Sequence, residues 1–112
     1  MGAALLYNRN KALAARRSRV AVALKKLTTL LSTRYSAQRI VLIGSGAHLE
    51  RFGFHSDLDI AVQGIPSKRF FHAAGEALLA AGEFNVDLIP VEDATTRMRE
   101  TIAKGKILYE KR

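Results

Sequence analysis

Two aspartates that lie two residues apart are the side chains of this 112-residue chain best placed to do chemistry. Asp57 and Asp59 belong to residues 56–62, where alternation predicts a strand, and residues two apart share one face of a strand. At ~4 Å and an effective dielectric constant near 20, two carboxylates repel by about 4 kcal/mol. A proton on one of them, or a cation between them, relieves this repulsion. Oxygen ligands suit Mg²⁺ or Mn²⁺, and Mg²⁺ usually completes its shell with substrate phosphates.

A glycine and a serine upstream supply the groups that phosphates need. Residues 40–43 are an apolar run that predicts a buried strand, and this run ends at Gly44 and Ser45. Glycine lets the backbone approach a ligand closely, and amides at the start of a following helix could bind phosphate. Together with the aspartate pair, they predict a metal–nucleotide site. The structural alternative is a turn serine followed by two solvated aspartates on an edge strand.

A third carboxylate favours the functional interpretation. Asp87 interrupts another apolar run, residues 85–89, which predicts a further strand. Three carboxylates from two strands make a plausible two-metal site, in which one ion binds the leaving phosphates and the other lowers the pKa of the attacking hydroxyl. Asp87 would then lie beside the nucleophile and help to take its proton.

These motifs resemble the minimal nucleotidyltransferases (MNT) of the DNA polymerase β superfamily, and in particular the antitoxin half of bacterial pairs whose other half is a HEPN-type protein. The family pattern is a strand ending in Gly-Ser, a short helix, S-D-x-D on the next strand, and a later Asp. The matching residues are Gly44, Ser45, Ser56, Asp57, Asp59 and Asp87. Residues 102–109 also resemble the closing segment of that family, so the resemblance covers roughly residues 38–110. It implies an α/β (α+β) fold, with a small mixed sheet flanked by helices.

The resemblance implies an enzyme that moves a nucleoside monophosphate, AMP from ATP, to a hydroxyl acceptor, and the acceptor is expected to be a tyrosine or serine of a partner protein. The implied cofactor is Mg²⁺ or Mn²⁺. The implied metal ligands, which are also the catalytic residues, are Asp57, Asp59 and Asp87. Nucleotide binding is implied for Gly44, Ser45 and Ser56, with Gly44 and Ser45 holding the β- and γ-phosphates.

One segment departs from the family pattern. The family often has Ala-Arg-Gly shortly after Gly-Ser, whereas residues 47–49 of this chain are Ala, His and Leu. His48, or Arg51 about one helical turn away, could substitute for the arginine, so His48 joins the nucleotide-binding candidates. A surface role for His48 is an equal alternative. The departure also leaves open a catalytically weak or inactive binding module that acts through its basic N-terminal helix.

Charge is distributed unevenly along the chain. The net charge is +8, yet the first 49 residues contain basic residues and no acidic residue. Such asymmetry favours a polyanion or an acidic partner, and a solvated basic face is the alternative. Nucleic acid is therefore possible, but no motif supports it beyond charge.

Two classes of protein are disfavoured by composition. The absence of cysteine excludes a disulfide framework and a thiolate zinc site. No apolar run approaches the ~20 residues of a membrane span, and residues 2–7 are too short for a signal-peptide core. We therefore expect a cytoplasmic protein with no membrane partner.

A long basic helix is predicted to precede the sheet. Helix-favouring residues run from Asn8 or Asn10 to about Arg34, and one apolar stripe follows them. A 25-residue helix is about 37 Å long, whereas a domain of this size is roughly 26 Å across. We therefore expect the helix to overhang the core and to meet a HEPN-type protein, a second copy or nucleic acid. The stripe comprises Leu13, Val20, Leu24, Leu27 and Leu31.

The whole chain, residues 1–112, is predicted to form one domain, with the basic helix in residues 1–36 and the catalytic core in residues 37–110. Further elements are a helix over residues 68–81, a strand over residues 84–89, a helix from Glu92 or Asp93 to Ala103, and a short last strand over residues 107–109. The residues expected to pack from the first of these helices are Phe70, Phe71, Ala74 and Leu78, with Ala81 as a further candidate.

Overall fold

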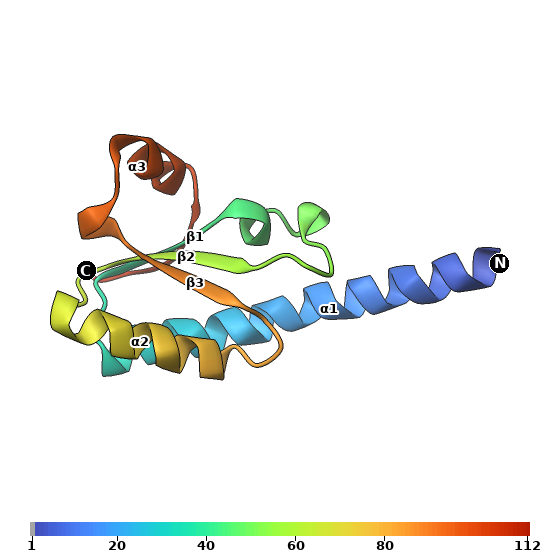
Figure 1. Ribbon diagram of the computed structural model, residues 1–112, viewed down its shortest axis with the longest axis horizontal. Helices are drawn as coiled ribbons and strands as arrows, with labels where there is room; N and C mark the ends of the chain where they lie inside the picture. The colour runs from blue at the N-terminus through green and yellow to red at the C-terminus, as the bar shows by residue number, and fades with distance from the viewer. Residues whose placement is uncertain (1) are drawn as a thin grey trace.

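The computed structural model describes residues 2–112 and has a four-stranded mixed sheet with helices on both faces (Figure 1). The strand order is β3-β2-β1-β4, in which β2 and β4 run antiparallel to β1 and β3 runs parallel to β2. The predicted small mixed sheet with flanking helices and a long N-terminal helix is confirmed. The elements are α1 (Ala3–Thr29), β1 (Arg39–Ile43), β2 (Leu58–Gln63), α2 (Ser67–Ala80), β3 (Val86–Pro90), α3 (Thr96–Ala103) and β4 (Lys106–Glu110).

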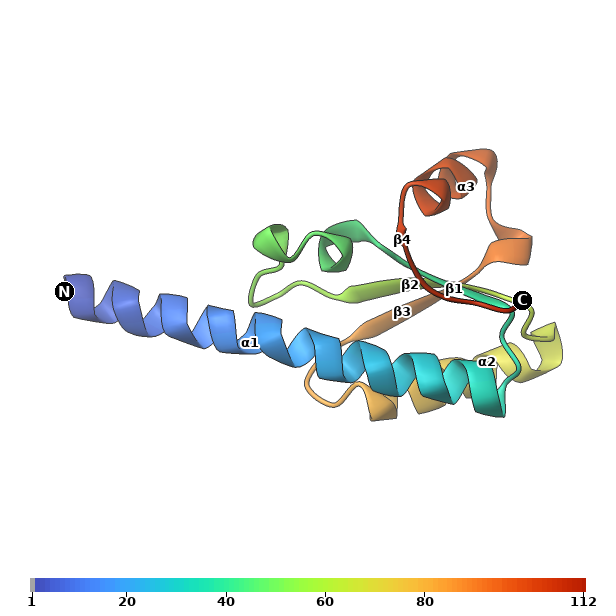
Figure 2. The same cartoon turned by 180° about the vertical axis from the view of Figure 1, so that it is seen from behind.

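Helices cover the two faces of the sheet unequally. Figures 1 and 2 show α1 and α2 against one face and α3 against the other. Because strand side chains alternate, Ile40 and Leu42 of β1 pack in the core under α1 and α2, whereas Val41 and Ile43 pack with Ile102 of α3. Strand β1 is thus buried on both faces, which explains its continuous apolar sequence.

Helix α1 is longer than its predicted span. It begins at Ala3 rather than at Asn8 or Asn10, and it continues through a π-helical turn, Leu30–Arg34. The early start follows from alanine and leucine in its first turn, which favour helix strongly. Met1, the first residue of the predicted 1–36 segment, lies outside the described residues. The predicted stripe does face the core, where Val20, Leu27 and Leu31 are buried.

The N-terminal end of α1 extends alone beyond the sheet in Figures 1 and 2. The molecule accordingly measures 52 × 28 × 24 Å. Exposed apolar side chains lie along this end, at Leu5, Leu6 and Tyr7. Among residues 2–112, no helix has an apolar stretch that could cross a membrane.

Helix α2 packs only partly as predicted: Phe70 and Ala74 do lie against the core. Its buried residues are Ala73 and Ala77, whereas Phe71 is 91% exposed and Leu78 is 48% exposed. The predicted packing of Phe71 and Leu78 is therefore wrong. Two small residues one turn apart let α2 lie close to α1 and the sheet, so Phe71 and Leu78 remain outside.

A break divides the segment that was predicted to form one helix before Ala103. A short 3₁₀ turn, Val91–Asp93, is followed by Thr95, whose hydroxyl caps α3 by accepting a hydrogen bond from the Met98 amide at 3.2 Å. A threonine at this position is a favoured N-cap. Helix α3 is therefore short, Thr96–Ala103, and begins where its outer side chains can reach the Gly44 turn.

Candidate functional site

The three predicted aspartates lie at the N-terminal ends of β2 and β3. Asp59 of β2 is in register with Asp87 of the parallel strand β3 and, on its other side, with Ile43 of β1. Asp57 lies one residue before β2 and not inside it as predicted, and both Asp57 and Asp87 are exposed. Since Leu58 belongs to the core under α1 and α2, Asp59 faces the side of the sheet that α3 covers.

Electrostatic repulsion acts among these carboxylates. Partial burial raises the pKa of Asp59, and the negative charges of Asp87 and then Asp57 raise it further. The sequence predicted repulsion between Asp57 and Asp59, and in the structure Asp87 has the larger effect. A positive charge placed among the three aspartates would relieve this repulsion.

Gly44 brings the backbone next to Asp59. Its φ of +70° lies in the left-handed region that favours glycine, and a Cβ built on it would lie 2.8 Å from Oδ2 of Asp59. Any other side chain at this position would meet that carboxylate. Gly44 is therefore required both for the turn after β1 and for the close approach to Asp59.

The donor set of the three aspartates suits a hard divalent cation. All six carboxylate oxygens are ligands of the kind that Mg²⁺ and Mn²⁺ accept. Across residues 2–112, no three acidic or imidazole side chains are already arranged as a metal site. The repelling carboxylates of Asp57, Asp59 and Asp87 would therefore have to turn toward a shared ion. Their chemistry fits the cation, and their role as metal ligands stays a prediction.

The other predicted site residues lie around these aspartates in different settings. Ser45 lies in the 3₁₀ turn Gly44–Ala47, and its carbonyl accepts a hydrogen bond from the His48 amide. The Ser56 hydroxyl accepts a hydrogen bond from the Gly53 amide at 2.8 Å, so it closes the turn that leads into Asp57. His48 is exposed, with Nδ1 3.9 Å from Oε1 of Glu50. Nucleotide binding by these residues stays a prediction.

A cavity of about 380 Å³ lies between the Gly44 turn and α3. His48 and Arg51 line it together with three residues that the sequence argument did not include, Arg97, Thr101 and Lys104. Their spacings of four and three place them on one face of a helix, so the pattern itself was visible in the sequence. What the sequence did not show is that this face of α3 lies opposite Gly44. Ile43, Ala47, Glu100 and Gly105 complete the lining.

Two arginines of α1 hold the loop that leads into the aspartates. Arg17 donates from Nε to the Phe52 carbonyl at 2.8 Å and from Nη2 to the Glu50 carbonyl at 3.0 Å. Arg16 donates from Nε to the Gly53 carbonyl at 3.2 Å and from Nη2 to that of Ser56 at 3.3 Å. Arg17 interrupts the apolar stripe of α1, and this cation within the stripe was the signal that the sequence offered.

Two aromatic rings pack against the guanidinium of Arg16. The Arg16 guanidinium lies 5.4 Å from the centre of the Phe52 ring and 4.8 Å from that of Phe84. The two rings meet edge to face at 5.8 Å, and Phe52 is fully buried. Phe52 is therefore a core residue.

Replacing Arg17 with glutamine is expected to loosen the loop over residues 50–56. Both carbonyl contacts of Arg17 would be lost, which should lower the free energy of unfolding by about 1–3 kcal/mol. Amide hydrogen exchange should become faster in residues 50–56 and stay unchanged in β1. Lys11→Gln, which removes the same charge from an exposed position of α1, is the control. Unchanged exchange in Arg17→Gln would show that the loop holds its shape without the arginine.

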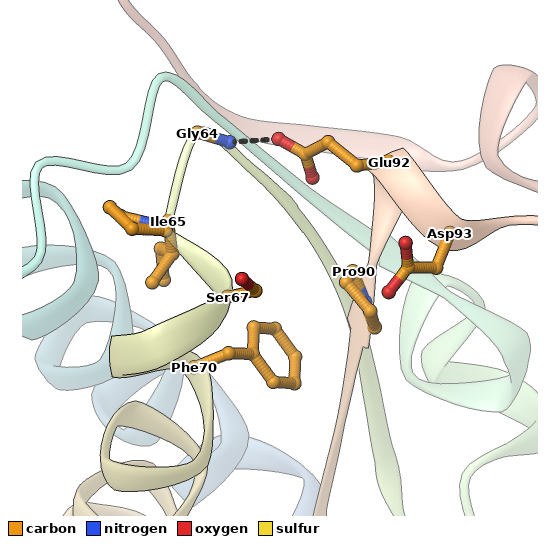
Figure 3. Close-up of a pocket in the computed structure, with 8 residues that line it drawn as sticks. Gly64, Ile65, Ser67, Phe70, Pro90, Glu92 and Asp93 are labelled. Carbon is orange, nitrogen blue, oxygen red and sulfur yellow. Dashed lines mark hydrogen bonds between the residues drawn. The ribbon is translucent and has the colours of Figure 1, made fainter.

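A second cavity, of about 530 Å³, lies at the opposite ends of β2 and β3 (Figure 3). The Gly64 amide donates to Oε2 of Glu92 at its edge, at 2.8 Å, and Phe70 faces its interior. None of the predicted site residues lines this cavity. Its charged lining residues, Glu92 and Asp93, are both acidic, so it does not suit a phosphate group.

Comparison with known proteins identifies similar folds among solved structures. No protein-family model matches the chain, and no curated protein matches it. The chain is similar to one in the structure of a tri-AMPylated HEPN toxin of Shewanella oneidensis in complex with MNT antitoxin, at 25% identity and a TM-score of 0.62 over 81% of this chain and 72% of the other.

Two further structures support the same assignment. A toxin–antitoxin with AMP-PNP matches at 26% identity and a TM-score of 0.68, over 80% of this chain and 74% of that chain. The toxin–antitoxin MntA-HepT matches at 24% identity and a TM-score of 0.60, over 80% and 72% of the two chains. The resemblance drawn from Gly44, Ser45 and the three aspartates is thus confirmed at the level of the fold: the chain has the nucleotidyltransferase fold of the MNT type.

Proposed function

We propose that the protein is a metal-dependent nucleotidyltransferase that moves AMP from ATP to a hydroxyl of a HEPN-type partner protein. The observation that carries the proposal is the grouping of Asp57, Asp59 and Asp87 beside the Gly44 turn. Two of the similar structures support it, because one contains an AMPylated HEPN toxin with its MNT antitoxin and the other contains AMP-PNP.

The three aspartates would divide two tasks in the reaction between them. The acceptor oxygen attacks the α-phosphorus of ATP, the bond from that phosphorus to the oxygen bridging to the β-phosphate breaks, and pyrophosphate leaves. Asp87 would accept the proton of the attacking hydroxyl. Asp57 and Asp59 would hold Mg²⁺ or Mn²⁺, which when bound supplies positive charge against the phosphates and lowers the pKa of the hydroxyl. Ser45 would contact a phosphate, and Gly44 would leave room for it.

The projecting end of α1 is the surface that we assign to the partner. Leu5, Leu6 and Tyr7 are exposed there, beside the basic residues Arg9 and Lys11. Such a helix offers apolar contacts and positive charge to an acidic protein surface. The same observation supports the alternative function, a binding module that holds its partner and transfers little or no nucleotide.

Transfer of AMP to the partner tests the proposal directly. The purified protein is incubated with ATP, Mg²⁺ and a HEPN-type partner, and the partner is analysed by intact-mass spectrometry. We expect a mass increase of one adenylyl group that requires Mg²⁺. Asp57→Asn should lower Mg²⁺-dependent ATP binding, measured by calorimetry, about tenfold or more while the fold remains intact. A complex that forms without any transfer would favour the binding module.

A further inference from the structure

The cavity between the Gly44 turn and α3 has the charge of an anion site. Arg51 lies on one wall, and Arg97 and Lys104 lie on the other, so three permanent cations face one space. Glu100 is the single carboxylate in the lining. The cavity volume of about 380 Å³ lies within the usual range for small-molecule sites. An arginine can donate two parallel hydrogen bonds to phosphate oxygens, and a lysine contributes a point charge.

The cavity also has the right position for part of a nucleotide. Gly44 borders it, and the same glycine lies against the carboxylate of Asp59, which is not among the residues that line the cavity. A chain of phosphates that begins at the aspartates and passes Gly44 would therefore enter the cavity. The second cavity, beside Glu92 and Asp93, offers no such path, because it lies at the far end of the strands and is acidic.

We propose that this cavity holds the β- and γ-phosphates of ATP, and afterwards the leaving pyrophosphate, through Arg97 of α3, Lys104 directly after this helix, and Arg51. The inference rests on the proposed function and adds a new binding element to it. Helix α3 would be the wall that recognises the leaving group, while the aspartates act on the α-phosphate.

Binding of pyrophosphate without metal tests this assignment. Pyrophosphate, ATP and AMP are titrated separately into the full chain in the presence of EDTA, and the variant combines Arg97→Gln with Lys104→Gln. Removing each cation should lower the affinity for pyrophosphate and for ATP about tenfold, so the double variant should lose about 100-fold. The affinity for AMP should be unaffected. Both residues are exposed, so the variant is expected to fold.

A control with the same loss of charge separates a site from general attraction. Arg99→Gln with Lys111→Gln removes two exposed cations that do not line the cavity. The affinity of this variant for pyrophosphate should lie within about twofold of that of the unchanged protein. Equal losses in the two variants would overturn the assignment, since the attraction would then follow net charge alone.

The experiment distinguishes failure of the inference from failure of the proposed function. If AMP is transferred but pyrophosphate binds equally well without Arg97 and Lys104, the cavity is not the phosphate site. The inference then fails while the proposed function stands. If pyrophosphate binds through these two residues and no AMP is transferred to any partner, the proposed function fails while the phosphate cavity stands.

Discussion

Asp59→Asn is expected to lower the rate of AMP transfer by about 10³-fold, a loss in the range for a positioned acid–base or charge-stabilising group. Asp59 is the central member of the site, because it is in register with Asp87 on one side and lies against Gly44 on the other. Asparagine keeps the shape of the side chain but removes the charge that would hold the cation.

The same substitution is expected to stabilise the protein at neutral pH. Because the folded pKa of Asp59 lies above its ordinary value, its ionised form is less favourable in the folded chain than in the unfolded chain. The penalty is therefore absent below the unfolded pKa of about 4 and grows as the pH rises through the folded pKa. Asp59→Asn should accordingly unfold at higher denaturant than the unchanged protein at pH 7, and this difference should vanish toward pH 3.

The predicted loss of transfer and gain of stability in Asp59→Asn are tested against a control variant and without divalent cations. Measurements of stability are made in EDTA, so that no cation compensates the charges. Asp93→Asn removes an exposed aspartate at the far end of the strands and should change neither transfer nor the pH dependence. If Asp59→Asn keeps transfer, the aspartates are not the reaction centre. If it unfolds the protein, Asp59 holds the fold and its assignment to the site is wrong.

The elements that support this site could be predicted because each has a strong local signal. The apolar residues 40–43 indicate a buried strand, and the run of helix formers before Arg34 indicates a helix. Gly44 led us to expect a close approach of the backbone to another group. The structure shows that this group is the Asp59 carboxylate.

The arginines that shape the site depend on contacts far apart in sequence, so no local pattern could assign them. Arg17 contacts Phe52 and Glu50 only because α1 crosses beneath that loop. Arg97 and Lys104 share a helix face, but whether that face meets Gly44 or solvent is decided by the packing of α3 on β1. Phe71 and Leu78 of α2 were misjudged for a related reason: large apolar residues indicate a packing face, yet the fully buried residues of this helix are Ala73 and Ala77.

Gly105→Ala is expected to lower the free energy of unfolding by about 1–3 kcal/mol, the usual range for overpacking a tight core. Gly105 lies between α3 and β4, where the backbone presses against β1. A Cβ there would lie 2.6 Å from Cγ1 of Val41, 2.7 Å from the carbonyl oxygen of Leu42 and 2.9 Å from Cγ2 of Ile43. The carbonyl belongs to the middle of the sheet and cannot move aside, so α3 would have to shift.

The matched substitution Gly75→Ala isolates this effect from the general cost of replacing a glycine. A Cβ at Gly75, in α2, would meet no atom within 4 Å, so alanine there should stabilise the helix by about 0.5–1 kcal/mol. Urea unfolding of the two variants should therefore move in opposite directions. A shift of α3 would also displace Lys104 from its cavity, so Gly105→Ala should weaken pyrophosphate binding in the folded protein while Gly75→Ala should not. If Gly105→Ala is as stable as the unchanged protein, α3 tolerates displacement from β1, and the position of its cations is not fixed by this contact.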